Sequence, residues 1–488
     1  MRRSSSRAML SLAGGLAVLS FGGCAVGPDY RRPSADVPPA WQAEAPWHEA
    51  EPSDAALKGN WWELFQDATL NPLVEQALEG NQNLRVAAAR LEQARSQVTV
   101  ARSYLYPELD LQASAARGKT SANRPLAEYR VPNQATVQNN FTLGPSVNYE
   151  LDLFGRVRRE VEGYRAAAEQ AAADFENTRL MLTTQLVSDY FTLRELDSEI
   201  DVVNHSLDLE RDALTFVTSR HDLGYATGLD LAQQQALVQS SAAQLELLQV
   251  QRAQNEHAIA TLVGTPAPSF SIAPVVSPGN LPALPIGLPS DLLQRRPDVA
   301  SAERAMAAAN ARIGVARAAY FPTIQLMPLV PNIGWESTAI SALFNAPSQL
   351  WSVGLSASQT LFDAGRTRAN VHIAEEDYSA AVATYRQTVL SAMEEVENGI
   401  TGLTSLGRAA SHANDSVASA QRAFDIASDR YKGGVAIYLD VLTAEQTLLG
   451  NQRLAVQIHG QQFVTAVYLV KALGGGWQEL GPAVSRAD

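Results

Sequence analysis

Two long stretches without proline constrain the fold of this chain more than any other feature of its sequence. They cover residues 156–223 and 366–432. If helical throughout, each would be roughly 100 Å long at a rise of about 1.5 Å per residue. Helices of ordinary globular domains are far shorter, about 8–20 residues. The sequence therefore predicts two long struts instead of a globular core.

The first stretch also has the apolar spacing of a coiled coil, with steps of three, four or seven residues. The residues in this stripe are Leu186, Tyr190, Leu193, Leu196, Ile200, Val203, Leu207, Leu214 and Val217. We therefore expect the struts to pack along their length against other helices.

The two struts belong to an internal duplication. Gly155 before the first strut is echoed by Gly365 before the second, each is followed by an arginine, and a glycine-rich turn ends each strut. These anchors recur in the same order at a spacing of roughly 210 residues, which indicates two structural repeats. We expect the repeats over 71–285 and 286–474.

Both repeats are expected to contain the same order of elements. The first would hold a helix over 71–103, a strand pair over 105–154, the long helix over 156–223 and a half-length helix over 229–263. The second would hold a helix over 290–318, a strand pair over 320–364, the long helix over 366–432 and a half-length helix over 439–473. Stacked end to end, the two shorter helices of a repeat would match one strut in length.

Period-two alternation predicts two β-strands around a polar connection in each strand pair. The connections are expected over 118–140 and 334–348. Aromatic residues near the strand ends, such as Tyr104 and Trp351, are typical of an outer-membrane barrel. Four strands cannot close a barrel, so closure would need several chains. The alternative, two isolated hairpins, would leave exposed strand edges.

The N-terminus is typical of a secreted lipoprotein. Residues 1–23 place Arg2, Arg3 and Arg7 before an apolar run that is too short to span a bilayer, which predicts a signal peptide. Cys24, the only cysteine, follows directly, and its position favours lipidation at a bacterial lipobox over a free thiol. An acyl chain such as palmitate would then anchor the chain without a spanning helix.

The segments at either end of the repeats are expected to be extended. Residues 24–70 are rich in proline and polar residues, which predicts a tether behind the lipid anchor, and residues 475–488 form a C-terminal tail.

Composition and motifs exclude several classes of function. The net charge is −13, so no nucleic-acid partner is expected. His48-Glu49 lacks the second histidine of a metalloprotease, and Gly118-Lys119-Thr120 lacks the first glycine of a P-loop. The histidines are scattered, so neither a metal site nor a cofactor is expected. The sequence therefore predicts no enzyme.

The chain resembles the outer-membrane efflux proteins of the TolC family, in its NodT-type lipoprotein branch. The resemblance covers nearly the whole mature chain and rests on several motifs taken together. These motifs are Cys24-Ala25-Val26-Gly27-Pro28-Asp29-Tyr30, Trp61-Trp62 with Phe65, Leu292-Leu293-Gln294-Arg295-Arg296-Pro297-Asp298-Val299, Thr360-Leu361-Phe362-Asp363-Ala364-Gly365 and the two glycine-rich turns.

The resemblance implies a mainly α fold with a membrane β-barrel. A homotrimer would contribute four strands per protomer to one 12-stranded barrel in the Gram-negative outer membrane, in contact with its lipid, and the struts would continue it as a coiled-coil helical barrel into the periplasm. The implied function is an exit duct that passively conducts small molecules such as drugs from an inner-membrane pump of the RND or MFS class and a periplasmic adaptor. The alternatives are the duct of a type I protein secretion system and a structural coiled-coil lipoprotein.

The resemblance also implies that the channel is gated where the helices begin after each turn. The gate positions would be Leu229, Asp230, Leu439, Asp440 and Thr443. Arg220 and Arg430, just before the turns, are candidates for salt bridges that hold the tip shut. Gly224, Gly228 and Gly434 would form left-handed turns and contact the adaptor.

Two simpler interpretations remain open at these positions. Thr227 and Asp230 fit a capping box, in which the acid stabilises its own helix. Arg220 and Arg430 can equally be C-terminal helix charges that complement the helix dipole.

Overall fold

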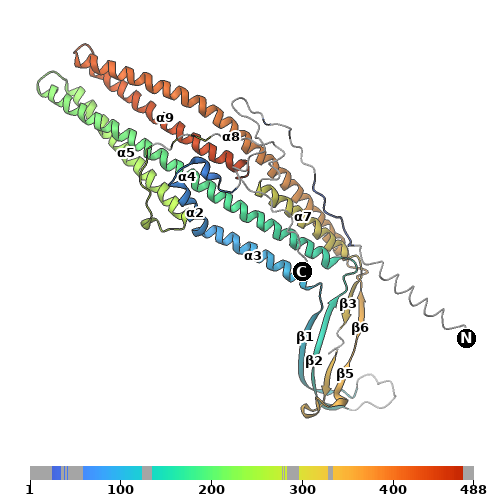
Figure 1. Ribbon diagram of the computed structural model, residues 1–488. Helices are drawn as coiled ribbons and strands as arrows, with labels where there is room; N and C mark the ends of the chain where they lie inside the picture. Colours follow the sequence, from blue (N-terminus) through green and yellow to red (C-terminus); the bar gives the residue numbers. More distant parts are fainter. Residues whose placement is uncertain are drawn as a thin grey trace. The chain divides into compact units, whose positions relative to one another are not determined.

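The computed structural model describes residues 25–33, 38, 41, 59–123, 135–276, 279, 281–282, 296–327 and 333–475. These residues form long helices and one small sheet (Figure 1). The predicted mainly α fold is confirmed. The predicted signal peptide and Cys24 lie outside the described residues, as do most of the tether and the tail from residue 476. None of the described helices is both long and apolar enough to cross a membrane.

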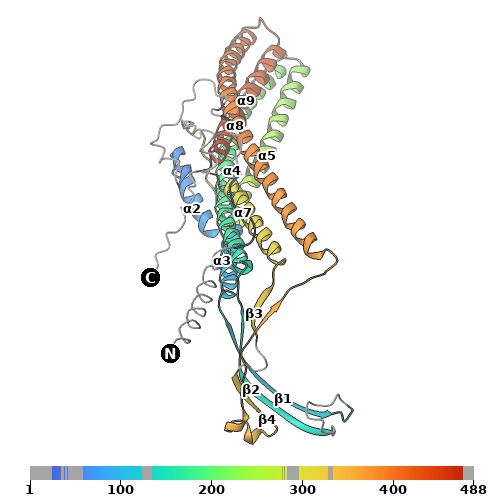
Figure 2. The same ribbon diagram turned by 90° about the vertical axis from the view of Figure 1, so that its right-hand side faces the viewer.

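The two struts are single helices. Helix α4 spans Arg156–Asp222 and α8 spans Arg366–Lys432, each with 67 residues. A turn leads from each into a shorter helix, α5 over Gly228–Val263 and α9 over Tyr438–Ala472. Figures 1 and 2 show that α4 with α5, and α8 with α9, run side by side as antiparallel hairpins. The turn regions are called the two tips below.

The helix expected over 71–103 is in fact two helices, α2 over Leu70–Gly80 and α3 over Gln82–Ser103. Asn81 separates them, because its side chain caps α3 by accepting from the Leu84 amide at 3.0 Å. The same side chain donates to the Leu262 carbonyl at 2.9 Å, near the end of α5. The break therefore brings the end of α5 onto the start of α3.

The second repeat has the equivalent joint. Helix α7 spans Pro297–Ala318, and Arg296 just before it donates to the Ala472 carbonyl at 3.2 Å, at the end of α9. In the first repeat the end of α5 thus contacts the start of α3, and in the second the end of α9 contacts the start of α7. This end-to-end contact agrees with the lengths of the helices.

The sheet contains four strand lines. Strand β1 (Glu108–Thr120) pairs with β2 (Thr136–Glu150) along its whole length. On its other side β2 pairs with both β3 (Thr323–Met327) and β4 (Ile333–Ser337), which therefore continue one line. Strands β6 (Gly354–Ser358) and β5 (Gln349–Trp351) pair with β3 and β4 and form the fourth line.

The expected limits of the polar connections are wrong. Strands β1 and β2 extend into 118–140, where Lys119 lies opposite Val137, and β4 lies within 334–348 apart from its first residue. Strand pairing uses backbone groups, so polar side chains at a strand end do not stop it. Polarity alone therefore misplaced these boundaries.

The chain forms two compact units, each of which contains parts of both repeats. Unit 1 comprises residues 1–33, 91–171 and 302–385, and unit 2 comprises residues 34–90, 172–301 and 386–488. All strands lie in unit 1 and both tips lie in unit 2. The expected repeats are therefore not the compact units of the fold.

In unit 2 an aromatic cluster packs between the short helix η2 (Trp61–Phe65) and the helices α4 and α9. Trp61 and Trp62, in η2, are almost fully buried. The ring of Phe65 lies 4.7 Å from that of Phe191, which stacks on Phe463 at 4.6 Å. Each such side chain contributes roughly 1.5–3 kcal/mol on burial, so this cluster ties η2 to α4 and α9.

In unit 1 the first described residues, Ala25–Pro33, form a strap against three helices. Arg159 of α4 binds the carbonyl oxygens of Val26 and Gly27, both at 3.3 Å, and the Asp29 carboxylate at 2.7 Å. Asn310 of α7 donates to the Pro28 carbonyl, and Arg32 donates to the Tyr385 hydroxyl of α8. The strap thus fixes the residue next to Cys24 at the start of α4.

Candidate functional site at the helix tips

The two tips close with the same backbone motif. The Tyr225 amide donates to the Arg220 carbonyl at 2.7 Å, and the Val435 amide donates to the Arg430 carbonyl at 2.9 Å. In each case the residue before the donor, Gly224 or Gly434, bonds back to the residue after the arginine. This pair of nested bonds is a Schellman motif. Arg220 and Arg430 therefore occupy equivalent positions.

Only two of the three expected turn glycines have the left-handed conformation. Gly224 has φ +78° and Gly434 has φ +73°, as the motif requires. Gly228 is instead the first residue of α5, and its φ is not positive. The left-handed expectation for Gly228 is wrong, because Thr227 and not Gly228 caps the helix.

The acids at the two helix starts differ in what they bind. Asp230 forms a capping box: its carboxylate accepts from the Thr227 amide at 2.9 Å, and the Asp230 amide donates to the Thr227 hydroxyl. Asp440 follows Ile437, which offers no side-chain cap, and its carboxylate is exposed. Of the two, Asp440 is the acid that remains available to ions.

The apolar gate candidates are exposed at the helix starts. Leu229 is 66% exposed and Leu439 is 47% exposed within the single chain. Thr443 lies one turn into α9, and its hydroxyl donates to the Leu439 carbonyl at 2.8 Å. All three side chains lie on the outside of a single chain, where other copies or solvent can meet them.

The two tip arginines also differ. The Arg220 guanidinium lies 4.9 Å from the ring centre of Tyr431 and 5.7 Å from that of Phe216. Arg430 makes no equivalent ring contact within the described chain, and neither arginine forms an ion pair there. Within one chain, Arg220 therefore joins the hairpins by a cation–π contact and not by the expected salt bridge.

Directly below the turns, the hairpins pack through what we call the tip cluster. It consists of Val217, Leu237, Tyr431, Tyr438, Val441 and Leu442. A polar chain runs beside it: Tyr438 of α9 donates to the Gln234 side chain of α5, and Gln234 donates to the Glu210 carbonyl of α4. The hydrogen bond from Tyr438 to Gln234 is a second link between the hairpins.

Sequence reasoning missed Tyr431, Tyr438 and Glu210, although one signal was present. Glu210 stands at the next coiled-coil position after Leu207, between the apolar residues Val203 and Leu214. A charged residue inside an apolar stripe marks a buried polar site, since such positions normally face a partner helix.

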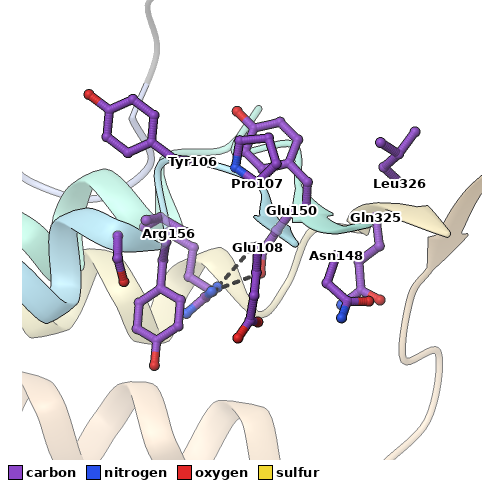
Figure 3. A pocket seen from close by; sticks show the side chains of 12 residues that line it. Tyr106, Pro107, Glu108, Asn148, Glu150, Arg156, Gln325 and Leu326 are labelled. Carbon is purple, nitrogen blue, oxygen red and sulfur yellow. Dashed lines mark hydrogen bonds and ion pairs between the residues drawn. The ribbon is translucent and has the colours of Figure 1, made fainter. Parts of the chain in front are cut away.

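The junction between strands and helices in unit 1 forms a cavity of about 690 Å³. Figure 3 shows Arg156, the first residue of α4, beside Glu150 at the end of β2. The guanidinium binds both carboxylate oxygens, at 2.9 and 2.7 Å. Such a bidentate pair fixes the orientation of the end of β2 relative to the start of α4. The cavity therefore lies where the sheet is joined to the strut. No group of three metal-binding side chains occurs in the part of the chain that the structure describes.

Comparison with known proteins agrees with this architecture. A model of the family described as outer membrane efflux protein matches residues 73–265 and 288–475, two segments that each hold one strut. The solvent efflux pump outer membrane protein SrpC of Pseudomonas putida is 34% identical over 471 residues, covering 94% of this chain and 97% of that protein.

A second relative and a solved structure extend the match. The pyoverdine export outer membrane protein OpmQ of Pseudomonas aeruginosa is 33% identical over 482 residues, covering 97% of this chain and 98% of that protein. The structure of the outer-membrane channel OprN superposes with a TM-score of 0.84 at 33% identity, covering 93% of this chain and all of that one.

Long helical hairpins joined to a strand sheet define the class of outer-membrane channels. The chain belongs to the outer membrane efflux protein family. The predicted resemblance and outer-membrane location are confirmed, and the chain is an exit component of an efflux system and not an enzyme. Lipidation of Cys24 and the roles of the tip residues stay predictions.

Proposed function

We propose that three copies of this chain form a duct whose tips narrow the channel. The observation that carries this proposal is the pair of equivalent tips, in which Leu229, Leu439 and Asp440 are exposed at the helix starts while the turns above them are rigidly capped. In a trimer, Asp440 would supply a ring of three carboxylates, which favours cations and is screened by salt.

The duct would pass small molecules delivered by an inner-membrane pump through a periplasmic adaptor. The names of SrpC and OpmQ support small organic cargo. We propose a pump of the RND or MFS class, with the turns around Gly224, Gly228 and Gly434 as the surface that contacts the adaptor. Lipidation at Cys24 would add an anchor to the outer membrane.

Single-channel recording in planar bilayers tests the gate. We expect a small, cation-preferring conductance for the wild-type trimer. Asp440→Asn should lower the cation preference, seen as a reversal potential closer to zero in a salt gradient. The matched control is Asp415→Asn, which removes the same charge from an exposed site on α8.

Each other outcome has a definite meaning. If Asp440→Asn leaves the ion selectivity of the pore unchanged, the constriction lies elsewhere in the channel. A folded trimer without conductance would contradict the channel and favour a structural lipoprotein. A deletion strain that keeps its tolerance of solvents and dyes but loses a secreted protein would favour type I secretion.

A further inference from the structure

Two carboxyl side chains are buried where α4 packs against α9, close to the tips. Glu210 of α4 is fully buried, and Glu445 of α9 is 6% exposed within the single chain. Both stand in apolar stripes: Glu445 lies between Leu442 and Leu448, which are also buried. Charged acids are almost never fully buried without a partner.

Two other buried acids of α4 have basic partners. The Asp197 carboxylate accepts from Arg252 at 2.6 Å, and the Glu199 carboxylate accepts from Arg453 at 2.6 Å. For Glu210 and Glu445, in contrast, the described residues offer no arginine or lysine within ion-pair distance. Glu210 and Glu445 therefore lack the basic partners that Asp197 and Glu199 have.

At Glu210, burial favours the neutral carboxyl group and outweighs two hydrogen bonds that favour the charged form. One carboxyl oxygen accepts from the Ser241 hydroxyl at 2.8 Å and from the Ser206 hydroxyl at 3.2 Å. The other oxygen is buried with no hydrogen-bond partner. A buried anionic oxygen left in this way is costly.

Several acidic groups face this site, and the basic group near it is Arg220, which lies against the ring of Tyr431. The acidic groups are Glu210 on α4, Asp230 on α5, Tyr431 on α8, and Tyr438 and Glu445 on α9. Burial, followed by the charge of Glu210, raises the pKa of Glu445 to about 7. Burial also raises the pKa of Glu210.

We propose that Glu210 and Glu445 form a carboxyl latch, which holds the two hairpins together while protonated and loosens them at the tips when both groups are charged. The physical coupling is short. Tyr438 lies two turns before Glu445, belongs to the tip cluster and donates to the Gln234 side chain, and Gln234 donates to the backbone carbonyl of Glu210. Repulsion between the carboxylates would therefore act on the link between the hairpins.

The sign of the pH effect follows from the raised pKa. The folded chain holds the proton on Glu445 up to about pH 7, whereas an unfolded chain releases it near the ordinary value of 4.5. The stabilisation is fully present below about pH 4.5 and is lost as pH rises through about 7. The proposal rests on the channel function proposed above, since the tips are where conduction would respond.

The test is the conductance of the full trimer in planar bilayers from pH 6 to pH 8. We expect wild-type conductance to rise by about threefold or more over this range as the latch opens. Glu445→Gln, which imitates the protonated acid, should remove the rise and keep the low value. Glu246→Gln on α5 changes an exposed glutamate in the same way and should keep the wild-type response.

A second measurement does not depend on conduction. The infrared carbonyl band of a protonated carboxylic acid, taken as wild type minus Glu445→Gln, should be present at pH 6 and lost by about pH 8. Absence of this band at pH 6 would overturn the latch, as would a pH response that survives in Glu445→Gln. A wild-type trimer that never conducts but shows the band would instead contradict the channel function alone.

Discussion

At the scale of single residues, Arg220 and Arg430 show how equivalent positions acquire different roles. In each turn the backbone carbonyl of the arginine accepts the equivalent hydrogen bond of the Schellman motif. Among the described residues, Arg220 contacts aromatic rings and Arg430 does not, because Tyr431 precedes the second turn while His221 holds the equivalent place in the first. The duplication therefore predicts the turns correctly but not the contact between them.

This difference gives a prediction for the tip. Arg220→Gln should remove a cation–π contact of about 0.5–2 kcal/mol between the hairpins. We expect higher single-channel conductance and faster hydrogen exchange at the Tyr225 amide. Arg430→Gln is the matched control, because it removes the same charge from the equivalent turn without a ring contact. Equal effects of the two variants would show that charge, and not stacking, matters.

At the scale of elements, helix lengths were predictable and helix interruptions were not. Helix α8 covers the same residues as the predicted stretch, Arg366–Lys432, because Gly365 and Gly433 mark its ends. The break at Asn81 was not predicted, since the hydrogen bond that causes it joins Asn81 to Leu262, far away in the sequence.

The unequal caps of α5 and α9 give a second prediction. Ile437→Thr should allow the capping box that α9 lacks, with Asp440 accepting from the amide of residue 437 as Asp230 does from Thr227. Ile437 is 63% exposed, so little packing is lost.

A cap of about 1 kcal/mol should slow amide exchange in the first turn of α9 about fivefold. Thr227→Ile is the reciprocal control and should speed exchange at the start of α5. Unchanged exchange in both variants would refute the capping argument.

At the scale of the whole molecule, the sheet leaves both of its edges open. Within the described residues β1 pairs only with β2, and β6 pairs only with β3. Exposed edges invite pairing with another chain, and pairing of unlike edges closes into a ring. The number of strands alone allowed the sequence to predict that several chains are needed to close the barrel. The contacts between tips in a trimer could not be predicted in this way, because they involve side chains of neighbouring copies.

Ring closure can be tested by cross-linking. With Ala113→Cys in β1 and Ala357→Cys in β6 combined, a short thiol-specific cross-linker should convert the protein into a covalent trimer on denaturing gels. Either substitution alone should give no cross-link, because unlike edges meet. A ladder of ever larger species would indicate an open assembly, and cross-linking by one substitution alone would indicate pairing of like edges.

The strap bears on the order in which the parts of the chain can fold. Its partners Asn310 and Tyr385 lie 282 and 353 residues after the strap residues that they contact. Gly27 also lies so close to Gly314 that a Cβ added to Gly27 would come within 2.5 Å of the Gly314 backbone. These contacts cannot form until most of the chain has crossed the inner membrane. The strap is therefore among the later parts to settle, and its docking would report that export has proceeded past Tyr385.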